Sequence, residues 1–416
     1  MSNTEPLTST FSLPHNFFIQ GVLEAKREPA AGVMLPANLG ALAAFQGTFA
    51  GQGFNTIFRP DSAITPTPMP GPVTTTDPAD NVLELNLTTE TLSFSNNLVS
   101  IPNRGSGDQR DIFLNGVPYL QTINDVTTGQ PVGIHFEPGL WLSVPLTTDP
   151  KEPTTLARMA SIPHGTTLNA QGVSLPAIAG KPTIGAVDIT PFVGGQPGNT
   201  IKFQNQTAVN EATRRIPQNL AAFINSGQIT QAILDDPNTI LRQQIEKQEI
   251  TQTVVILIST KPESPLPRGP LPAGAEPSAP NIGGGTADIA FLQGQAAPAP
   301  GGPSSNANVP QMDAVFWIET VEYEVVVPAI TSGSPPVILD PVQKGTVPLV
   351  PQFVAEIPFV PGKGFAGGKV KVATTQIQYS QKVILDFKGL SWPHVSVASL
   401  VPSSPIPIPS HLLPLT

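Results

Sequence analysis

The chain of 416 residues contains no cysteine. A disulfide framework, thiol catalysis and thiolate ligation of a metal or haem are therefore excluded. Charged side chains make up only 12% of the residues, about half the share that is usual in soluble domains. The net charge of −9 is modest and gives no basic footprint, so we expect no nucleic-acid partner.

Long apolar runs are also missing. No stretch approaches the ~20 apolar residues needed to cross a bilayer, and the run VVILI at 254–258 is far too short. The N-terminus shows no basic start followed by an apolar run, so no signal peptide is expected. These absences predict a cytoplasmic protein with no membrane partner.

Proline and glycine are abundant, with 49 and 36 residues. Such a content argues against long helices and favours turns and irregular segments. Apolar residues still account for 39% of the chain, which is enough to build a core.

Apolar and polar residues alternate near both ends of the chain. Leucines alternate with polar residues over 82–88, and a longer alternation covers 375–387, with Gln381 as its one exception. The dipeptide Asn115-Gly116 predicts a hairpin turn. We therefore predict an all-β fold: an antiparallel, calycin-like β-barrel of eight to ten strands, closed by the last strand, which carries His394, and interrupted by a large loop and helix insertion.

The composition divides the chain into five expected parts. A short helix is expected after Asp236-Pro237, to about residue 250, and a linker rich in proline, glycine, alanine and serine over 261–310. The parts are an N-terminal arm (1–44), the first part of the barrel (45–173), the insertion (174–313), the closing strands (314–401) and a proline-rich tail (402–416).

A glycine motif is present without its usual context. GKGFAG at 362–367 matches the dinucleotide-binding pattern G-x-G-x-x-G, but a strand follows it where a helix should begin. The chain has no P-loop and no catalytic histidine or serine motif of known spacing. Catalytic residues stay unassigned.

His394 is the leading candidate for a site residue. In the segment LSWPHVSVASLVP at 390–402, it shares a strand face with Ser396, Ala398 and Leu400. Small side chains beside an imidazole leave room for a ligand inside a barrel, and neutral imidazole is the proximal ligand of many haem proteins. Spacing alone favours the simpler interpretation of a hydrogen-bonded barrel histidine.

A second pair lies two residues apart. His135 and Glu137 share a strand face with Trp141 in VGIHFEPGLWLSVP at 132–145. They could form an acid–base or pocket-lining pair, or a hydrogen-bonded pair that orients the strand. The second interpretation is favoured, because buried polar groups need partners in any case.

Four fragments in order resemble the nitrobindin family of haem-binding β-barrels. GTFAGQG at 47–53 is similar to its glycine-rich opening, with Phe49 where the family has tryptophan, and the next residues keep Thr56. GIHFEPGLW resembles the family segment that carries His135 and Trp141, and IPHGTTLNAQG resembles a later strand pair with the Pro and His reversed. WPHVSVASLV resembles the closing strand with its axial histidine, His394.

The resemblance covers a little under half of the chain and implies a function. It implies ferric haem b with His394 as the metal ligand, and Thr56, His135 and Trp141 as further cofactor-binding residues. It also implies activity on nitric oxide or peroxynitrite, so an enzyme would resemble a haem-dependent peroxynitrite isomerase. A homodimer is left open.

Two other functions stay open. The barrel could be a non-enzymatic carrier of an apolar small molecule, with a cavity lined by residues such as Trp141, Tyr379 and Leu400. Alternatively, it could be a structural or interaction protein whose barrel has lost its ligand.

Overall fold

The computed structural model describes residues 39–60, 81–149, 153–163, 165–201, 207–211, 214–261, 285–288, 308–343, 349–387 and 389–416. The expected arm up to residue 38, His164 and most of the linker at 261–310 lie outside these ranges. Among the described residues, no helix has the length and apolar composition to cross a lipid bilayer.

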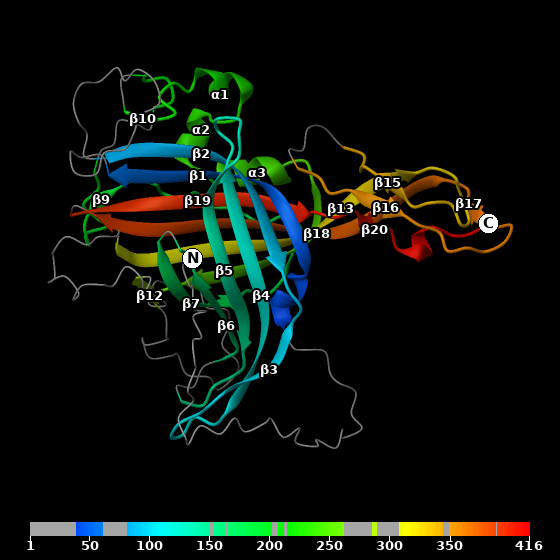
Figure 1. Ribbon diagram of the computed structural model, residues 1–416, viewed down its shortest axis with the longest axis horizontal. Helices are drawn as coiled ribbons and strands as arrows, with labels where there is room; N and C mark the ends of the chain where they lie inside the picture. The colour runs from blue at the N-terminus through cyan, green and yellow to red at the C-terminus, as the bar shows by residue number, and fades with distance from the viewer. Residues whose placement is uncertain are drawn as a thin grey trace, which may run out of the picture. The chain divides into compact units, whose positions relative to one another are not determined.

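Ten antiparallel strands form a closed barrel in which each strand pairs with the next one along the chain (Figure 1). The prediction of a closed all-β barrel of eight to ten strands is confirmed. The barrel strands are β1 (Gly47–Pro60), β2 (Asn81–Phe94), β4 (Ile112–Asp125), β5 (Val132–Val144), β6 (Thr155–Ser161), β7 (Thr166–Ser174), β11 (Glu249–Ser259), β13 (Asn308–Val327), β18 (Gly368–Phe387) and β19 (Leu390–Pro402).

The barrel closes where its last strand pairs with its first. Eight residues of β1, from Phe49 to Thr56, face partners on β19. Glycine allows this approach, because a Cβ atom on Gly53 would lie 2.3 Å from the carbonyl oxygen of Val397, and one on Gly51 would clash with β19 in the same way. The glycine-rich opening segment is therefore required by the close approach of β1 to β19.

Short elements surround the barrel. Near its strands lie η1 (Gly40–Ala44), β3 (Leu98–Asn103), β8 (Ile178–Ala179), β9 (Phe192–Val193), β10 (Arg215–Ile216), α1 (Ala221–Ser226), α2 (Gln231–Asp235), α3 (Thr239–Ile245) and β12 (Gly285–Asp288). A small lobe beside the ends of β13 and β18 contains β14 (Ile330–Thr331), β15 (Val337–Leu339), β16 (Phe353–Ala355), β17 (Gly364–Phe365), β20 (Ile406–Pro407) and η4 (Ser410–Leu412) (Figure 1).

The boundaries of the insertion differ from the expected 174–313. Strand β11 lies inside that range and enters the barrel between β7 and β13, and β13 itself begins at Asn308. The apolar run 254–258 belongs to β11, where Ile256 and Ile258 are fully buried. A strand buried on both sides lacks the alternation that marks a half-exposed strand, so the sequence pattern did not reveal it.

The expected hairpin at Asn115-Gly116 is wrong, because both residues lie inside β4. Gly116 instead allows β4 to pack closely against β5. A Cβ atom at this position would lie 2.9 Å from a methyl carbon of Leu142 on the neighbouring strand β5. The turn signal of the dipeptide is overridden by close contact between two strands.

The helices cover one side of the barrel from outside (Figure 1). Side chains of the helical segment, such as Ile233 and Leu241, are buried in one cluster with Phe54 and Leu85 of the barrel wall. Burial of such side chains contributes roughly 1.5–3 kcal/mol each. The outer face of β1 and β2 beneath the helices is therefore largely apolar.

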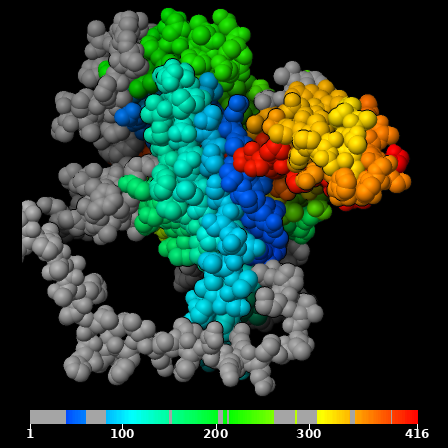
Figure 2. Space-filling model, turned by 45° about the vertical axis from the view of Figure 1, so that its right-hand side comes forward, coloured from blue at the N-terminus to red at the C-terminus, as the bar shows by residue number. Residues whose placement is uncertain are grey.

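The outer face of β4 and β5 is left uncovered by the helices. Figure 2 shows this surface in cyan and teal, with the helical segment in green at its upper end. Leu120, Phe136 and Met159 of β4, β5 and β6 are exposed on it. Among the described residues, helices therefore cover the barrel on one side only.

A polar seam lies between α3 and the barrel wall. Fully buried Glu319 of β13 accepts a hydrogen bond of 2.6 Å at Oε2 from Nε2 of Gln376. Gln376 Oε1 accepts in turn from Gln244 of α3 and from Gln248. Glu319 Oε1 has no hydrogen-bond partner among the described residues. Burial, opposed by the bond from Gln376, raises the pKa of Glu319 to about 8, so the carboxyl is neutral at physiological pH.

This buried acid makes stability depend on pH. Its pKa is about 8 in the folded protein against an ordinary value of 4.5, so the unfolded chain loses the proton first as pH rises. The free energy of unfolding should fall by roughly 1.4 kcal/mol per pH unit from this group between those two values, and level off above pH 8. Glu319→Gln should remove this pH dependence, so the free energy of unfolding of the variant should increase relative to that of wild type as pH rises.

Urea unfolding of wild type and Glu319→Gln at pH 5 to 9 measures the difference. Glu356→Gln, which removes an exposed carboxyl, controls for the loss of one negative charge. A constant difference between wild type and Glu319→Gln across this range would show that the carboxyl is ionised in the folded protein.

Candidate functional site

Contacts between strands on opposite sides of the barrel identify the side chains that point inward. Arg158 of β6 donates to Gln381 of β18, and Gln121 of β4 donates to Tyr379 of β18. Since residues two apart on a strand share a face, the polar positions of these strands line the interior. The apolar positions of β2, such as Leu83, lie outside in the cluster formed with the helices.

An aromatic layer fills one end of the interior. Phe45, directly after η1, stacks on Phe94 with ring centroids 4.7 Å apart. Trp141 contacts Phe45 edge-on at 5.6 Å and Phe316 at 5.2 Å. The structure therefore places Trp141, an expected cofactor-binding residue, inside a packed group of rings.

A buried ion pair forms the next layer. Arg158 Nη2 lies 2.6 Å from Glu137 Oε1, and Arg158 Nε donates to the hydroxyl of Tyr119 at 2.8 Å. Tyr119 in turn donates to Glu137. The guanidinium also lies 5.7 Å from the centroid of the Trp141 ring, within cation–π range. Every charged atom of the pair thus has a partner, which offsets the cost of burying it.

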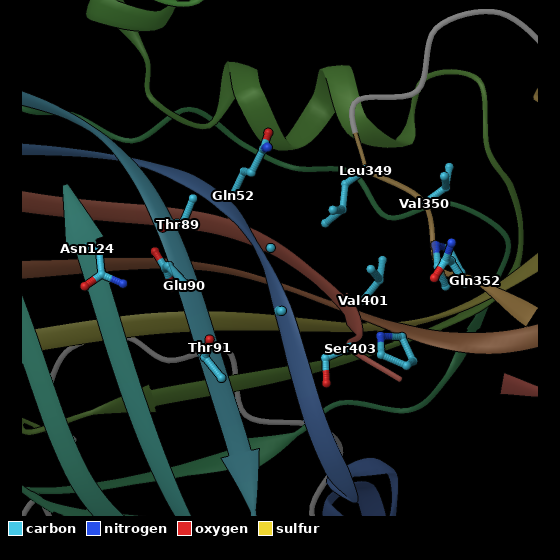
Figure 3. A pocket seen from close by; sticks show the side chains of 14 residues that line it. Gln52, Thr89, Glu90, Thr91, Asn124, Leu349, Val350, Gln352, Val401 and Ser403 are labelled. Carbon is cyan, nitrogen blue, oxygen red and sulfur yellow. The ribbon is translucent and has the colours of Figure 1, made fainter. Parts of the chain in front are cut away.

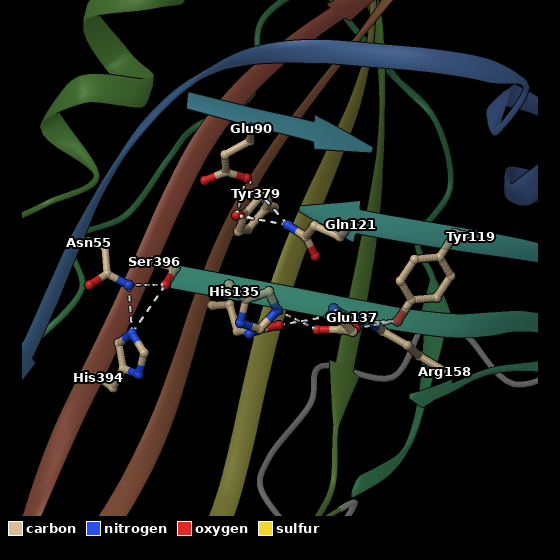
Figure 4. Close-up of polar contacts among 11 residues, drawn as sticks. Asn55, Glu90, Tyr119, Gln121, His135, Glu137, Arg158, Tyr379, His394 and Ser396 are labelled. Atoms are coloured by element: carbon tan, nitrogen blue, oxygen red, sulfur yellow. Dashed lines mark hydrogen bonds and ion pairs between the residues drawn. The ribbon is translucent and has the colours of Figure 1, made fainter. Parts of the chain in front are cut away.

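His135 belongs to this layer too (Figure 4). Its Nε2 lies 3.1 Å from Glu137 Oε2. Burial raises the pKa of Glu137, but the charge of Arg158 and the hydrogen bond from His135 outweigh it and lower the pKa to about 2. An ionised carboxylate can only accept, so His135 Nε2 carries the hydrogen. The pair fits the interpretation that it orients the strand.

Glu90 is a second buried carboxyl in the interior. Its Oε2 accepts from the hydroxyl of Tyr379 at 2.6 Å and from Gln121 at 3.3 Å, and its Oε1 accepts from Thr88 at 3.2 Å. Burial, opposed by these hydrogen bonds, raises the pKa of Glu90 to about 7. Both protonation states are therefore populated near neutral pH.

His394 lies at the other end of the interior, eight positions along β19 from Pro402, the partner of Phe49. Nδ2 of Asn55 lies 2.6 Å from His394 Nε2 and donates to Ser396 Oγ at 2.8 Å (Figure 4). The closing pairing of β1 with β19 brings these side chains together across 339 positions of sequence.

The tautomer of His394 follows from this network. The carbonyl oxygen of Asn55 accepts from Asn86 at 3.3 Å, so the amide nitrogen of Asn55 faces the imidazole. Nε2 of His394 is then the acceptor, and a neutral ring carries its hydrogen on Nδ1.

Thr56 lies on the opposite face of β1. It follows Asn55 directly and stands between Phe54 and Phe58, which are buried in the outer cluster with the helices. Consecutive residues of a strand point to opposite faces. The structure therefore places Thr56 outside the barrel, away from the face that carries His394.

A haem site would need an accessible lone pair on His394. The tautomer is suitable, since haem iron binds a neutral imidazole. The lone pair of Nε2, however, is held by the amide of Asn55 at 2.6 Å. Thr56 and Trp141 do not share a common space with His394. Among the described residues, no group of three or more His, Asp or Glu side chains is placed to hold a metal ion.

Comparison with known proteins gives little further guidance. No family model matches the chain, and no curated protein matches it. A solved structure, the crystal structure of Rv2717c from M. tuberculosis, aligns over 89% of this chain and 98% of that chain, with 10% sequence identity and a TM-score of 0.30. So low a score carries no argument about function.

Sequence patterns singled out His394 and missed the residues around it. Asn55 was detectable from the phase of β1, because it shares a face with Gly53, whose partner on β19 is Ala398. Glu90 lies on the same strand face as the polar residues of the alternation over 82–88. Nothing in that alternation indicated that the polar face points into the barrel. Arg158 gave no signal of its own, since its partner Glu137 lies on another strand.

The ion pair gives a test of the interior. Glu137→Leu or Arg158→Met alone should each lower the free energy of unfolding by about 3–5 kcal/mol, because each leaves a buried charge without its partner. The double variant replaces both charged groups with apolar ones. Its free energy of unfolding should fall by much less than the sum of the losses in the two single variants. Urea unfolding of the four proteins measures the coupling. Additive losses would mean that the two charges do not stabilise each other.

Proposed function

We propose that the protein binds a small molecule inside the barrel, at the end that carries His394, and acts as a carrier. One observation supports this proposal most. The aromatic layer around Trp141 fills one end of the interior, whereas His394 at the other end is half-buried beside polar Asn55 and Ser396. A barrel that is packed at one end and polar at the other is suited to holding a ligand at the polar end.

The polar groups indicate what the ligand carries. Asn55 Nδ2 donates to His394 Nε2, so the two groups currently satisfy one another. A hydroxyl or amide group of a ligand can replace this hydrogen bond for both residues, because it can accept from Asn55 and donate to His394. A purely apolar ligand would leave the two groups unpaired, at a cost of roughly 1–3 kcal/mol each. We therefore favour an apolar molecule with one such group over the wholly apolar ligand suggested by the sequence.

The buried charges favour a carrier over a catalyst. Glu137 and Arg158 are tied to each other and to Tyr119. Glu90 accepts hydrogen bonds from three side chains. These groups hold the strands together, and none of them is needed to bind the ligand at His394.

A matched set of probes tests this site. Naphthalene, 1-methoxynaphthalene and 1-naphthol share one ring system but differ in hydrogen bonding. Wild type should bind 1-naphthol most tightly, and His394→Ala and Asn55→Leu should weaken this binding by about tenfold, which is one to two hydrogen bonds. Met159→Ala, on the outer face of β6, is the control. Calorimetric titration measures the Kd values. Equal affinity for the three probes would contradict the proposed role of Asn55 and His394.

Haem b is the second candidate, and one observation favours it. His394 faces the interior beside the small side chains of Ser396 and Ala398, in the tautomer that iron requires. If haem is the ligand, it must displace the amide of Asn55. Activity on nitric oxide or peroxynitrite would depend on this candidate.

Haemin titration separates the two candidates. If haem binds at His394, wild type should show a Soret band that His394→Ala loses, and Asn55→Leu should bind haemin more tightly because it frees Nε2. Absorption spectra of the three purified proteins are the measurement. A Soret band that survives in His394→Ala would assign another ligand, and no band in wild type or Asn55→Leu would exclude haem.

A further inference from the structure

A second pocket lies outside the barrel. It is formed by the outer wall of β1, β2 and β19 and by the segment 349–352 that leads into β16 (Figure 3). Its volume is about 410 Å³, within the range of roughly 300–1,000 Å³ that is usual for small-molecule clefts. It is separate from the residues proposed above to bind a ligand inside the barrel.

The two sides of this outer pocket differ in chemistry. Leu349 and Val350 of the segment and Val401 of β19 supply apolar surface. Gln52 of β1 and Thr91 of β2 supply an amide and a hydroxyl. Such a lining fits a molecule with an apolar part and a hydrogen-bonding part.

Charge is almost missing from the lining. Glu90 is the one ionisable residue among the described residues that line the outer pocket. Its carboxyl oxygens accept hydrogen bonds from Tyr379, Gln121 and Thr88 inside the barrel. A charged ligand would lose its hydration here without gaining a partner of opposite charge.

The walls of the outer pocket are fixed by hydrogen bonds. Gln244 of α3 binds the backbone of Leu349 twice, donating to its carbonyl at 2.7 Å and accepting from its amide at 3.1 Å. The carbonyl of Gln352 accepts from the amide of Ile406 at 2.8 Å. A Cβ atom on Gly51 would lie 3.0 Å from a methyl carbon of Leu349, so glycine lets the segment approach β1. A pre-formed pocket loses little freedom on binding.

We propose that the outer pocket binds an uncharged amphiphile. The apolar chain would lie against Leu349 and Val401, and a hydroxyl-bearing head would lie against Gln52 and Thr91. The site does not depend on His394 or on a ligand in the barrel.

The test uses the full chain and three probes of equal chain length, all below their micellar concentrations. These are n-octyl β-D-glucoside, octyl sulfate and octylammonium. Wild type should bind the glucoside at least tenfold more tightly than either charged probe. Thr91→Trp should weaken glucoside binding at least tenfold by filling the pocket. Thr251→Trp, a matched change at an exposed position of β11, should leave it unchanged, as should His394→Ala. Calorimetric titration gives each Kd.

Each opposite result overturns the proposal. It fails if wild type does not bind the glucoside, if a charged probe binds within threefold of it, or if Thr91→Trp binds within threefold of Thr251→Trp. It also fails if His394→Ala abolishes binding, because the glucoside would then occupy the barrel. That last result would leave the proposed function inside the barrel standing, so the two proposals can fail separately.

Discussion

The pairing of β19 with β1 is the interaction on which the rest of the structure depends. It joins segments about 340 positions apart, so the chain must lose much conformational freedom before the backbone bonds form. Two features make the pairing possible: the glycines of β1, which accept close approach, and the uninterrupted length of β19. Without this pairing, Asn55 and His394 would not meet, and neither the inner site nor the floor of the outer pocket would exist.

The covering helices decide which face of each strand is polar. Beneath α1–α3 the outer wall of β1, β2 and β19 is mostly apolar, with Leu85 and Val397 in the buried cluster, and the polar seam of Glu319 and Gln376 lies beside it. The same strands therefore carry their polar residues inward, where each must find a partner because water is excluded. The Glu137–Arg158 pair and the bonds around Glu90 meet this need. The barrel is thus lined at its middle by hydrogen-bonded side chains, Tyr119 and Tyr379 among them, and at one end by the packed aromatic layer around Trp141.

Much of the fold could be predicted from alternation, whereas the site could not. Period-two patterns near both ends of the chain indicated an antiparallel barrel, and the position of His394 in the closing strand followed from them. Strand β11 was missed because it is buried on both faces. The partners of His394 depend on register between β1 and β19, and a shift of one residue exchanges Asn55 for Thr56. A family resemblance could name Thr56, but only the paired strands show which of the two points inward.

Buried polar side chains settle that register where hydrophobic alternation cannot. Strand β18 carries buried polar groups on both faces: Tyr379 points into the barrel to Glu90, and Gln378 points outward to Ser399 at 2.6 Å. Because Tyr379 on one face and Gln378 on the other are both buried, burial alone distinguishes two alignments of this strand less sharply than it would for a half-exposed strand. After a slip of one residue, Tyr379 and Gln378 would exchange faces, and Glu90 would lose its strongest donor while still buried. Leaving a buried carboxyl poorly bonded costs roughly 1–3 kcal/mol, so the polar contacts on both sides of β18 favour one alignment of the closing strands.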